Sequence, residues 1–417
     1  INGTLTELDT ETNRLRPIKP YPEYVFGQMP KKLKYRTNWN APVVTSPHDP
    51  SIIYYGTDKL LMSQDRGVNW TEISDDLTRN DKTKQAENGG PLTNEQVGAE
   101  FYGNIFYIVE SRQEAGYIWT GSDDGLVYLT KDHGKNWSNV TPKDLPETQI
   151  NAIELSPHDK ATAYIAATSY KLNVFEPMIY KTTNYGKSWS RIDKGLPEDT
   201  FVRVIREDTD RAGLLYAGTE IGLFISYNAG KDWQALQGNL PPVPITDLTM
   251  RHDKLVVATQ GRGFYILDDV ATLRQLDSKN KEANLTLFTP SKVKMTASSW
   301  SWTSDVDEGS NPEHGVHIAY LLNKEFKGPL SLDILDADGK IVRQYSSEET
   351  DFDRCVKNNM VPRLAYELEY PTVKLGLNHW VWDMRRGDMT CIDNVKIFSG
   401  STSKYLTETL AQSYGNK

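Results

Sequence analysis

The sequence predicts an all-β protein in which a β-propeller is followed by a β-sandwich of the immunoglobulin or fibronectin kind. Three observations support this prediction. An eight-residue pattern recurs four times, two strand-like runs precede each copy, and after about residue 285 alternating apolar residues and an Asp-Gly turn replace the pattern. We therefore assign residues 1–276 to the propeller, 285–400 to the sandwich and 401–417 to a C-terminal tail.

The charge balance narrows the range of partners. The 417 residues carry 47 basic and 56 acidic side chains, a formal net charge of −9. Because nucleic acids and anionic membranes attract clustered Lys and Arg, this balance argues against both as partners. No window approaches the roughly 18 consecutive apolar residues that a membrane-spanning helix needs, so we expect no membrane span.

The first residues and the cysteines give two further expectations. The chain begins Ile1-Asn2-Gly3 without an initiator Met, so we expect further residues upstream of it in the gene product. The two cysteines, Cys355 and Cys391, are too few for a disulfide scaffold or a cysteine-based metal cluster. They can pair once or stay free.

The predicted propeller begins with a hairpin and continues with repeated units. Residues 1–18 predict one hairpin that turns at Asp9–Asn13. The octet, Ser/Thr-x-Asp/Asn-x-Gly-x-x-Trp, occurs at Ser63–Trp70, Thr130–Trp137, Thr182–Trp189 and Ser226–Trp233. The strand pairs before the octets are Ile53–Thr57 with Leu60–Met62, Tyr117–Gly121 with Leu126–Leu129, Ala163–Ala167 with Met178–Lys181, and Leu214–Gly218 with Leu223–Ile225. A fifth unit, Leu255–Thr259 with Gly263–Leu267, lacks the octet and predicts a degenerate blade.

The octet suits a hairpin turn between two strands. Its Asp or Asn side chain can accept hydrogen bonds from backbone amides of the turn, its Gly supplies a positive φ, and its Trp covers the turn. Successive Trp residues are 67, 52 and 44 positions apart, which fits propeller blades of roughly 40–50 residues with an insertion in the first interval. We therefore expect the four Trp residues to occupy equivalent positions.

Five to six blades are visible. Six blades can form a closed ring if the opening hairpin completes the last blade. The hairpin-only beginning fits the later part of a larger propeller array better, and we favour that interpretation.

After about residue 285 the strand runs have no octets. They are Leu285–Phe288, Val316–Leu321, Leu330–Ile334, Ile341–Tyr345 and Gly376–Asp383. Their alternation and the turn Asp336–Gly339 are typical of an antiparallel sandwich. Residues Ser346–Pro362 predict a charged loop, and Leu406–Ser413 a short helix.

The octets resemble the Asp-box (BNR) repeats of sialidases, xyloglucanase-like glycoside hydrolases and the luminal domain of sortilin. Longer motifs are similar to exported bacterial proteins called glycosyl hydrolase-like or sortilin-like; they are Asp76–Asn80, Gly121–Gly125, Val202–Glu207, Leu215–Glu220, Gly261–Asp269, Gly376–Asn378 and Val381–Asp383. The resemblance implies an exported or cell-surface protein, with more propeller upstream. Because these families include both hydrolases and receptors, it implies a polysaccharide or protein partner without deciding between catalysis and binding.

Glycoside hydrolysis needs two carboxylates about 5–10 Å apart across a cleft, one of them with a raised pKa. Candidates lie where strands end in turns or where the long insertion ends, because loops on rigid scaffolds carry function. They are Glu100, Asp123, Asp124 and Glu220. The alternative for Asp123 and Asp124 is an ordinary turn role.

Ligand-binding candidates are aromatic or basic. Aromatic rings can stack on sugars, and we select Phe101, Tyr102, Tyr170 and Phe175. Arg203 is considered because Arg pairs bidentately with carboxylates, and Arg262, between two glycines, as a lining residue of the central channel. Arg262, flanked by glycines in a turn, can equally satisfy neighbouring backbone carbonyls. The usual sialidase arginine motif is absent from the sequence.

No metal or cofactor is predicted. His48 and His158 occupy equivalent Ser-Pro-His-Asp segments, which favours a structural turn over a metal site. Phosphate-loop, dinucleotide and serine-hydrolase signatures do not occur.

We favour a binding or assembly module that uses the loop Asp75–Gly103 and the channel mouth, completed by upstream propeller residues or another chain. The alternative is a glycoside hydrolase that uses a carboxylate pair.

Overall fold

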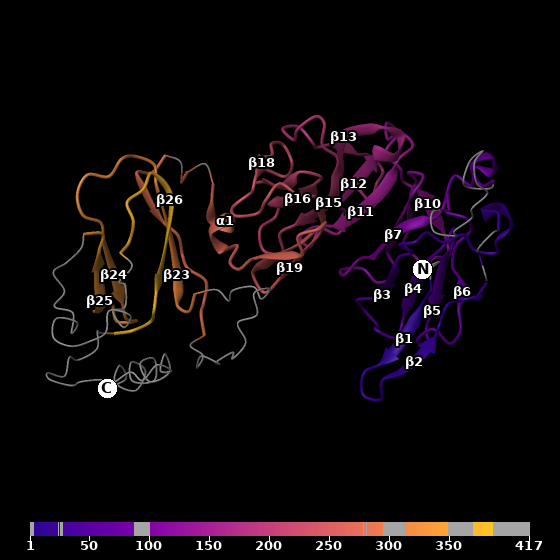
Figure 1. Ribbon diagram of the computed structural model, residues 1–417, viewed down its shortest axis with the longest axis horizontal. Helices are drawn as coiled ribbons and strands as arrows, with labels where there is room; N and C mark the ends of the chain where they lie inside the picture. The colour runs from indigo at the N-terminus through magenta and orange to yellow at the C-terminus, as the bar shows by residue number, and fades with distance from the viewer. Residues whose placement is uncertain are drawn as a thin grey trace, which may run out of the picture. The chain divides into compact units, whose positions relative to one another are not determined.

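The computed structural model describes residues 4–23, 25, 28–86, 101–277, 279–280, 282–294, 313–348 and 370–386 (Figure 1). It divides into two compact units, Ile1–Leu267 and Asp268–Lys417. The candidate Glu100, both cysteines and the predicted C-terminal tail with its helix lie outside the described residues, as does most of the predicted loop after Ser346. The described chain is all-β apart from short helical turns, as predicted.

Unit 1 contains four antiparallel sheets of four strands, each built from strands that follow one another in the sequence. The sheets are β3(Val43–Thr45)–β4(Ile53–Gly56)–β5(Leu60–Ser63)–β6(Thr71–Glu72), β7(Ile105–Glu110)–β8(Ile118–Ser122)–β9(Val127–Thr130)–β10(Trp137–Asn139), β11(Gln149–Leu155)–β12(Ala163–Ser169)–β13(Val174–Thr182)–β14(Ser190–Arg191), and β15(Val202–Glu207)–β16(Leu215–Thr219)–β17(Gly222–Ser226)–β18(Gln234–Ala235). This is the predicted blade order, so the propeller architecture is confirmed.

The first strands of successive blades contact one another, β7 with β11, β11 with β15 and β15 with the first strand of the next sheet, β19(Ile245–Arg251). They are therefore the inner strands of the propeller. In each of these four strands the pairing register shifts near the start, which leaves one extra residue in a bulge. The extra residues are Phe106, Asn151, Arg203 and Thr246.

Apolar side chains fill the space between neighbouring blades. Between the first two blades, the buried Tyr54 and Leu60 pack against Ile105, Ile108 and Ile118. A second cluster joins the next two blades around Trp119, Ile150, Ile165 and Met178. The middle strands β8, β12 and β16 are buried along their whole length, because a blade is covered on both faces.

Each octet closes the hairpin between the third and fourth strands of a blade. In the first blade the Asp65 carboxylate accepts a hydrogen bond from the Asn69 N–H at 2.8 Å, and the Ser63 hydroxyl accepts one from the Gly67 N–H at 2.7 Å. Gly67 has a φ of 81°, as the sequence predicted for this position. An added Cβ there would lie 2.8 Å from Ile18, so glycine is also required by close packing.

The four octet Trp residues occupy equivalent positions, as predicted. Each indole N–H donates to a backbone carbonyl of the preceding strand pair at 2.6–2.9 Å. The pairs are Trp70 with Ile18, Trp137 with Ile73, Trp189 with Val140, and Trp233 with Ile192. The Trp side chain therefore joins one blade to the next.

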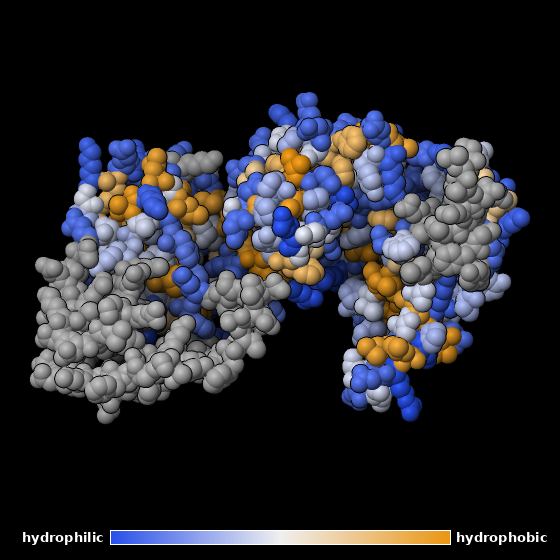
Figure 2. Space-filling model, in the orientation of Figure 1, coloured by the Kyte–Doolittle hydropathy of each residue, from blue (hydrophilic) through white to orange (hydrophobic). Residues whose placement is uncertain are grey.

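The opening hairpin, β1(Thr6–Asp9) and β2(Arg14–Pro17), corresponds to the third and fourth strands of a blade. Ile18 N–H donates to the Leu5 carbonyl at 2.9 Å, as Ile73 N–H does to Leu60. Ile18 also accepts the indole N–H of Trp70, the role that Ile73 has for the next blade. Apolar side chains gather on the surface over β1 and β2 (Figure 2).

The fifth unit is a three-stranded sheet of β19, β20(Lys254–Thr259) and β21(Phe264–Leu267). Leu248, Leu255 and Val257 are buried on one face of it. On the other face Phe264 is 78% exposed and Ile266 is also exposed. The opening hairpin forms its own two-stranded sheet, so among the described strands it does not complete this last sheet.

Unit 2 contains two antiparallel sheets and a short helix, α1(Ala271–Gln275). The sheets are β22(Leu285–Leu287)–β23(Val316–Leu322)–β26(Gly376–Trp382) and β24(Ser331–Leu335)–β25(Ile341–Ser346). They share one apolar core, in which the rings of Tyr345 and Trp380 lie 4.4 Å apart. The predicted strands are present, and their assignment to an immunoglobulin or fibronectin type stays a prediction.

Candidate functional site at the turn ends of the blades

The predicted site residues that the structure describes come from one end of the blades. Antiparallel pairing places the turn between the second and third strands at the same end as the connection into the next first strand. The octets lie at the opposite end. The residues at the common end are Phe101, Tyr102, Asp123, Asp124, Tyr170, Phe175, Arg203, Glu220 and Arg262.

Four of these residues meet around Phe201. The rings of Tyr170 and Phe201 stack with centroids 5.1 Å apart, and Phe175 lies 6.3 Å from Phe201. The Arg203 guanidinium lies 5.1 Å from the Phe201 ring and donates to a Glu220 carboxylate oxygen at 2.8 Å. We call Tyr170, Phe175, Phe201, Arg203 and Glu220 the rim cluster.

Local structure explains why these side chains converge. Tyr170 begins a short 3-10 turn, η3(Tyr170–Leu172), which ends at Asn173 in the left-handed conformation with a φ of 61°. This turn lets the chain reverse between β12 and β13. Arg203 is the bulge residue of β15, and a bulge redirects a side chain from the regular alternation.

Part of the rim cluster faces solvent. Phe175 is 45% exposed, and Leu172, Val174 and Ile221 beside it in the same two turns are exposed as well. Apolar side chains are visible over β13 in Figure 2. Phe201 itself is buried and supports the other rings. Phe201 was not predicted from the sequence, because no repeat position marks it.

Asp123 and Asp124 tie the turn between β8 and β9 to the long connection before β7. Backbone N–H groups of Gly103 and Asn104 donate to one Asp123 oxygen at 3.1 and 2.7 Å. The Asp124 carboxylate accepts from the Ser122 hydroxyl at 2.6 Å and from the Arg79 N–H at 2.8 Å. Both carboxylates therefore have several donors from the protein itself.

Burial dominates the electrostatics of this turn. It raises the pKa of Asp123 to about 7, although the hydrogen bonds from Asn104 and Gly103 lower it and the neighbouring Asp124 raises it further. Burial also raises the pKa of Asp124 above its ordinary value. A carboxyl with such a pKa can hold a proton near neutral pH, the property a general acid needs.

Arg36 anchors the same long connection. It is 4% exposed, and its guanidinium donates to Asp76 at 2.7 Å and to the Gly103 carbonyl at 2.9 Å. Its backbone N–H donates to the buried Asp58 at 2.8 Å. The motif that begins at Asp76 is recognisable in the sequence, but its contact with Arg36 was not predicted.

The two aromatic candidates before β7 have different surroundings: Phe101 is buried, and Tyr102 takes part in a polar network. Phe101 is 1% exposed, so the stacking role predicted for its ring does not fit the structure; the apolar ring is used in packing. The Tyr102 hydroxyl donates to Glu147, which also pairs with Lys84. Although burial alone would raise the pKa of Glu147, the hydrogen bonds from Lys84 and Tyr102 hold it below its ordinary value.

The predicted channel residue, Arg262, is exposed in the turn between β20 and β21. The inner strands instead carry charges that sequence reasoning did not select. Arg206 of β15 donates to Asp247 of β19 at 2.7 Å and lies 3.7 Å from Glu154 of β11. Burial raises the pKa of Glu154 to about 7, against the opposing charge of Arg206.

The two equivalent histidines serve the turns, as their repetition suggested. A ring nitrogen of His48 lies 2.7 Å from the Ser111 carbonyl, and that of His158 lies 2.8 Å from the Asp208 carbonyl. Among the described residues, no three His, Cys, Asp or Glu side chains are grouped so that they could hold a metal ion. Within the same residues no helix is long and apolar enough to span a membrane.

The comparisons with known proteins agree with the repeat type. Residues 125–301 match the family model described as Sortilin-Vps10, sortilin, neurotensin receptor 3. An oligoxyloglucan-reducing end-specific xyloglucanase of Emericella nidulans is 24% identical over 126 residues, which are 30% of this chain and 15% of that protein. A vacuolar protein sorting/targeting protein 10 of Colletotrichum graminicola is 26% identical over 99 residues, 24% of this chain and 6% of that protein.

Two solved structures with weak similarity carry GH74 enzymes in their titles. A GH74 xyloglucanase from Xanthomonas campestris gives a TM-score of 0.39 at 15% identity and covers 57% of this chain and 37% of that one. An ancestral GH74 enzyme gives a TM-score of 0.43 at 13% identity, and the match covers 78% of this chain and 40% of that one. The matched segments span less than a fifth of the length of the curated relatives.

Proposed function

We propose that this chain, an Asp-box β-propeller similar to sortilin-type proteins and to xyloglucanases, is an exported binding module for a polysaccharide or a protein partner. The observation that carries the proposal is the rim cluster. It places a half-exposed Phe175 and a stacked Tyr170 at the turn end of one blade, next to Arg203 and Glu220 of the following blade.

The physical properties of the rim cluster suit recognition. Exposed aromatic rings on a rigid support bury a large apolar area with little loss of conformational entropy, and they can stack on a sugar ring or pack against a protein. The Arg203–Glu220 pair next to the rings can donate and accept hydrogen bonds. Tyr102, at the end of the loop Asp75–Gly103, lies at the same end of the blades. In this proposal unit 2 serves as a spacer or docking domain.

Glycoside hydrolysis is the second candidate, and the observation in its favour is the raised pKa of Asp123 beside Asp124. The hydrogen bonds weigh against it. The donors around both carboxylates are backbone and side-chain groups that hold the turn together, which suits a structural role. Glu220 is likewise paired with Arg203. We therefore favour binding.

The test is retention on immobilised polysaccharides, with xyloglucan as the first member of a plant, algal and host panel, combined with an assay of released reducing ends. Retention without turnover, reduced about tenfold in affinity by Phe175→Ala, supports the proposal. The matched control is Phe264→Ala, which removes another exposed ring on a different sheet and should leave retention unchanged.

Turnover that is lost in Asp123→Asn or Glu100→Gln would replace the binding proposal by the hydrolase. If no polysaccharide is retained, the polysaccharide half of the proposal is wrong. The protein partner is then tested by crosslinking from a cysteine placed at Phe175, with a cysteine at Lys187, an exposed residue at the octet end of the blades, as control. Equal crosslinking from both positions would contradict a partner at the rim cluster.

A further inference from the structure

A groove beside the first blade has a composition unlike the rest of this acidic protein. It runs between the segment that follows β2 and the first octet, and Lys19, Tyr21, Lys34, Tyr35 and Trp70 lie along it. The described residues that line this groove include two lysines and no acidic side chain. We call it the N-terminal groove.

Two tyrosine rings of the groove hold the Lys34 ammonium in place. The Lys34 ammonium lies 4.5 Å from the Tyr21 ring centroid and 5.1 Å from that of Tyr35. The two rings meet edge to face with centroids 6.4 Å apart. The Trp70 indole is fixed by its hydrogen bond to Ile18. A ligand would therefore meet a preformed arrangement of rings and positive charge.

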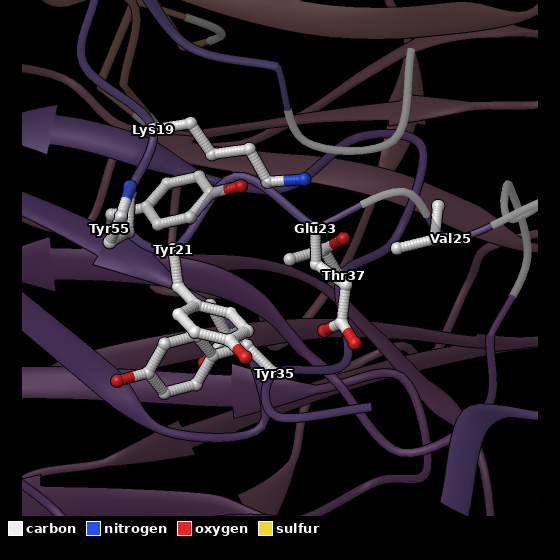
Figure 3. Close-up of a pocket in the computed structure, with 9 residues that line it drawn as sticks. Lys19, Tyr21, Glu23, Val25, Tyr35, Thr37 and Tyr55 are labelled. Carbon is white, nitrogen blue, oxygen red and sulfur yellow. The ribbon is translucent and has the colours of Figure 1, made fainter. Parts of the chain in front are cut away.

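A small, more enclosed pocket with room for about one water molecule lies next to the groove and shares Lys19, Tyr21 and Tyr35 with it (Figure 3). Tyr55 and Thr37 also line this pocket. The Thr37 hydroxyl is buried and has no hydrogen-bond partner among the described residues. Because a buried unsatisfied hydroxyl is costly, its position in a pocket lining points to a ligand or water that supplies the missing bond.

Two carboxylates, Glu23 and Glu72, lie near the pocket and the groove, and each interacts with neighbouring groups of the protein. Burial lowers the pKa of Lys19, and the carboxylate of Glu23 opposes that change. The Tyr35 hydroxyl donates to Glu72 at 2.7 Å, and Glu72 also pairs with Lys59. The neighbouring carboxylates Glu23 and Glu72 are therefore already partnered, and Lys34 is the exposed lysine of the groove.

We propose that the N-terminal groove binds a saccharide that carries a carboxylate, of the uronic acid type. Lysine supplies a point charge for the carboxylate, and tyrosine and tryptophan faces stack on the sugar ring. A water on the Thr37 hydroxyl can bridge to a polar group of the ligand. The groove is distinct from the rim cluster, although the inference rests on the proposed binding function in its choice of a saccharide.

The local sequence argues against an extended peptide as the ligand. Three prolines, Pro17, Pro20 and Pro22, interrupt the segment along the groove and provide no backbone N–H. The Ile18 N–H is already bonded to Leu5. The segment therefore cannot offer the ladder of backbone donors that recognises an added strand.

The test compares binding of oligogalacturonate and of its methyl ester to the full chain by titration calorimetry at 150 mM salt. We expect binding of the acid, and binding about tenfold weaker for the ester, because the ester keeps the sugar rings and loses the charge. Lys34→Gln should weaken binding of the acid about fivefold or more. Tyr21→Ala should weaken both ligands.

The matched control is Lys187→Gln, an exposed lysine at the octet position that Val68 occupies beside the groove. It makes the same charge change and should leave binding unchanged. Equal affinity for acid and ester, no effect of Lys34→Gln in a protein of unchanged Tm, absence of binding, or equal binding of poly-glutamate would each overturn the proposal. Phe175→Ala should leave oligogalacturonate binding intact, so failure at the rim cluster and failure at the groove are distinguishable.

Discussion

Trp233 is the most buried of the four octet tryptophans, and its indole N–H donates to Ile192 of the preceding blade at 2.6 Å. We expect Trp233→Ala to reduce the free energy of unfolding by about 3–5 kcal/mol, because it leaves a cavity and an unpaired carbonyl between two blades. Trp233→Phe should cost less, since it keeps part of the packing. Chemical denaturation measures both, and a wild-type midpoint for the Ala variant would contradict this role.

Asp65 and Asp132 make the stability of the octets depend on pH. Hydrogen bonds from the backbone and side chain of Asn69 lower the pKa of Asp65 from 3.8 to about 2, and those from Asn136 do the same for Asp132. A lowered folded-state pKa stabilises the fold above the unfolded-state pKa, and this stabilisation is lost as pH falls towards about 2.

We therefore expect the urea midpoint of the wild type to fall more steeply between pH 4 and pH 2 than that of the double variant Asp65→Asn/Asp132→Asn. Asparagine is a fair replacement because Asn184 and Asn228 occupy this position in the next two blades. Parallel pH profiles for the two proteins would show that these carboxylates contribute no such dependence.

At the residue scale, the sequence predicted the roles of the octet residues. It did not predict contacts between residues of different blades. The octet roles followed from a local turn and were correct. The pairing of Arg206 with Glu154 and Asp247 was not predictable, because these residues come from three inner strands and no repeat position marks them. Phe201 was missed for the same reason.

At the scale of elements, Arg36 holds the long connection between the first two blades. Because its guanidinium is buried against Asp58, Asp76 and Gly103, removing the charge leaves carboxylates without their partner. We expect Arg36→Met to destabilise the protein by about 3–5 kcal/mol in denaturant titrations. The control is Arg66→Gln, which removes an exposed arginine from Glu7 and should have no measurable effect. Equal effects would argue against the anchoring role.

The two middle strands of each blade could be located from the sequence, whereas the outer strands and the connections could not. Apolar runs and octets fixed the middle strands, since burial on both faces leaves a continuous hydrophobic signal. The fourth strands β6, β14 and β18 have two residues each and show no periodicity to detect. The bulge that redirects Arg203 depends on pairing between strands, which one sequence does not display.

At the scale of the whole molecule, the last sheet of unit 1 presents an uncovered face. Phe264 and Ile266 lie on the exposed side of β21, and an exposed edge strand with apolar residues favours association. We expect this chain to self-associate with rising concentration in sedimentation velocity experiments, and Phe264→Ser/Ile266→Ser to remain monomeric. A monomeric wild type at high concentration would contradict the prediction.

The repeats predicted the order of the blades. They predicted the class of function only in part. They mark the fold, because the octet is a folding device, whereas binding depends on turns that differ between blades. The rim cluster is built from such turns, and the N-terminal groove combines the first octet with the segment after β2. Their residues become neighbours through the packing of blades, which explains why Tyr170 and Arg203 were selected separately rather than as one site.

The most direct measurement of the binding account is hydrogen–deuterium exchange of the full chain with and without the ligand that it retains. The account predicts slower exchange in the two turns of the rim cluster, at residues 170–175 and 220–221, and a loss of this protection in Phe175→Ala. Protection confined to the octet end of the blades, or unchanged in Phe175→Ala, would contradict the claim that the rim cluster is the binding surface.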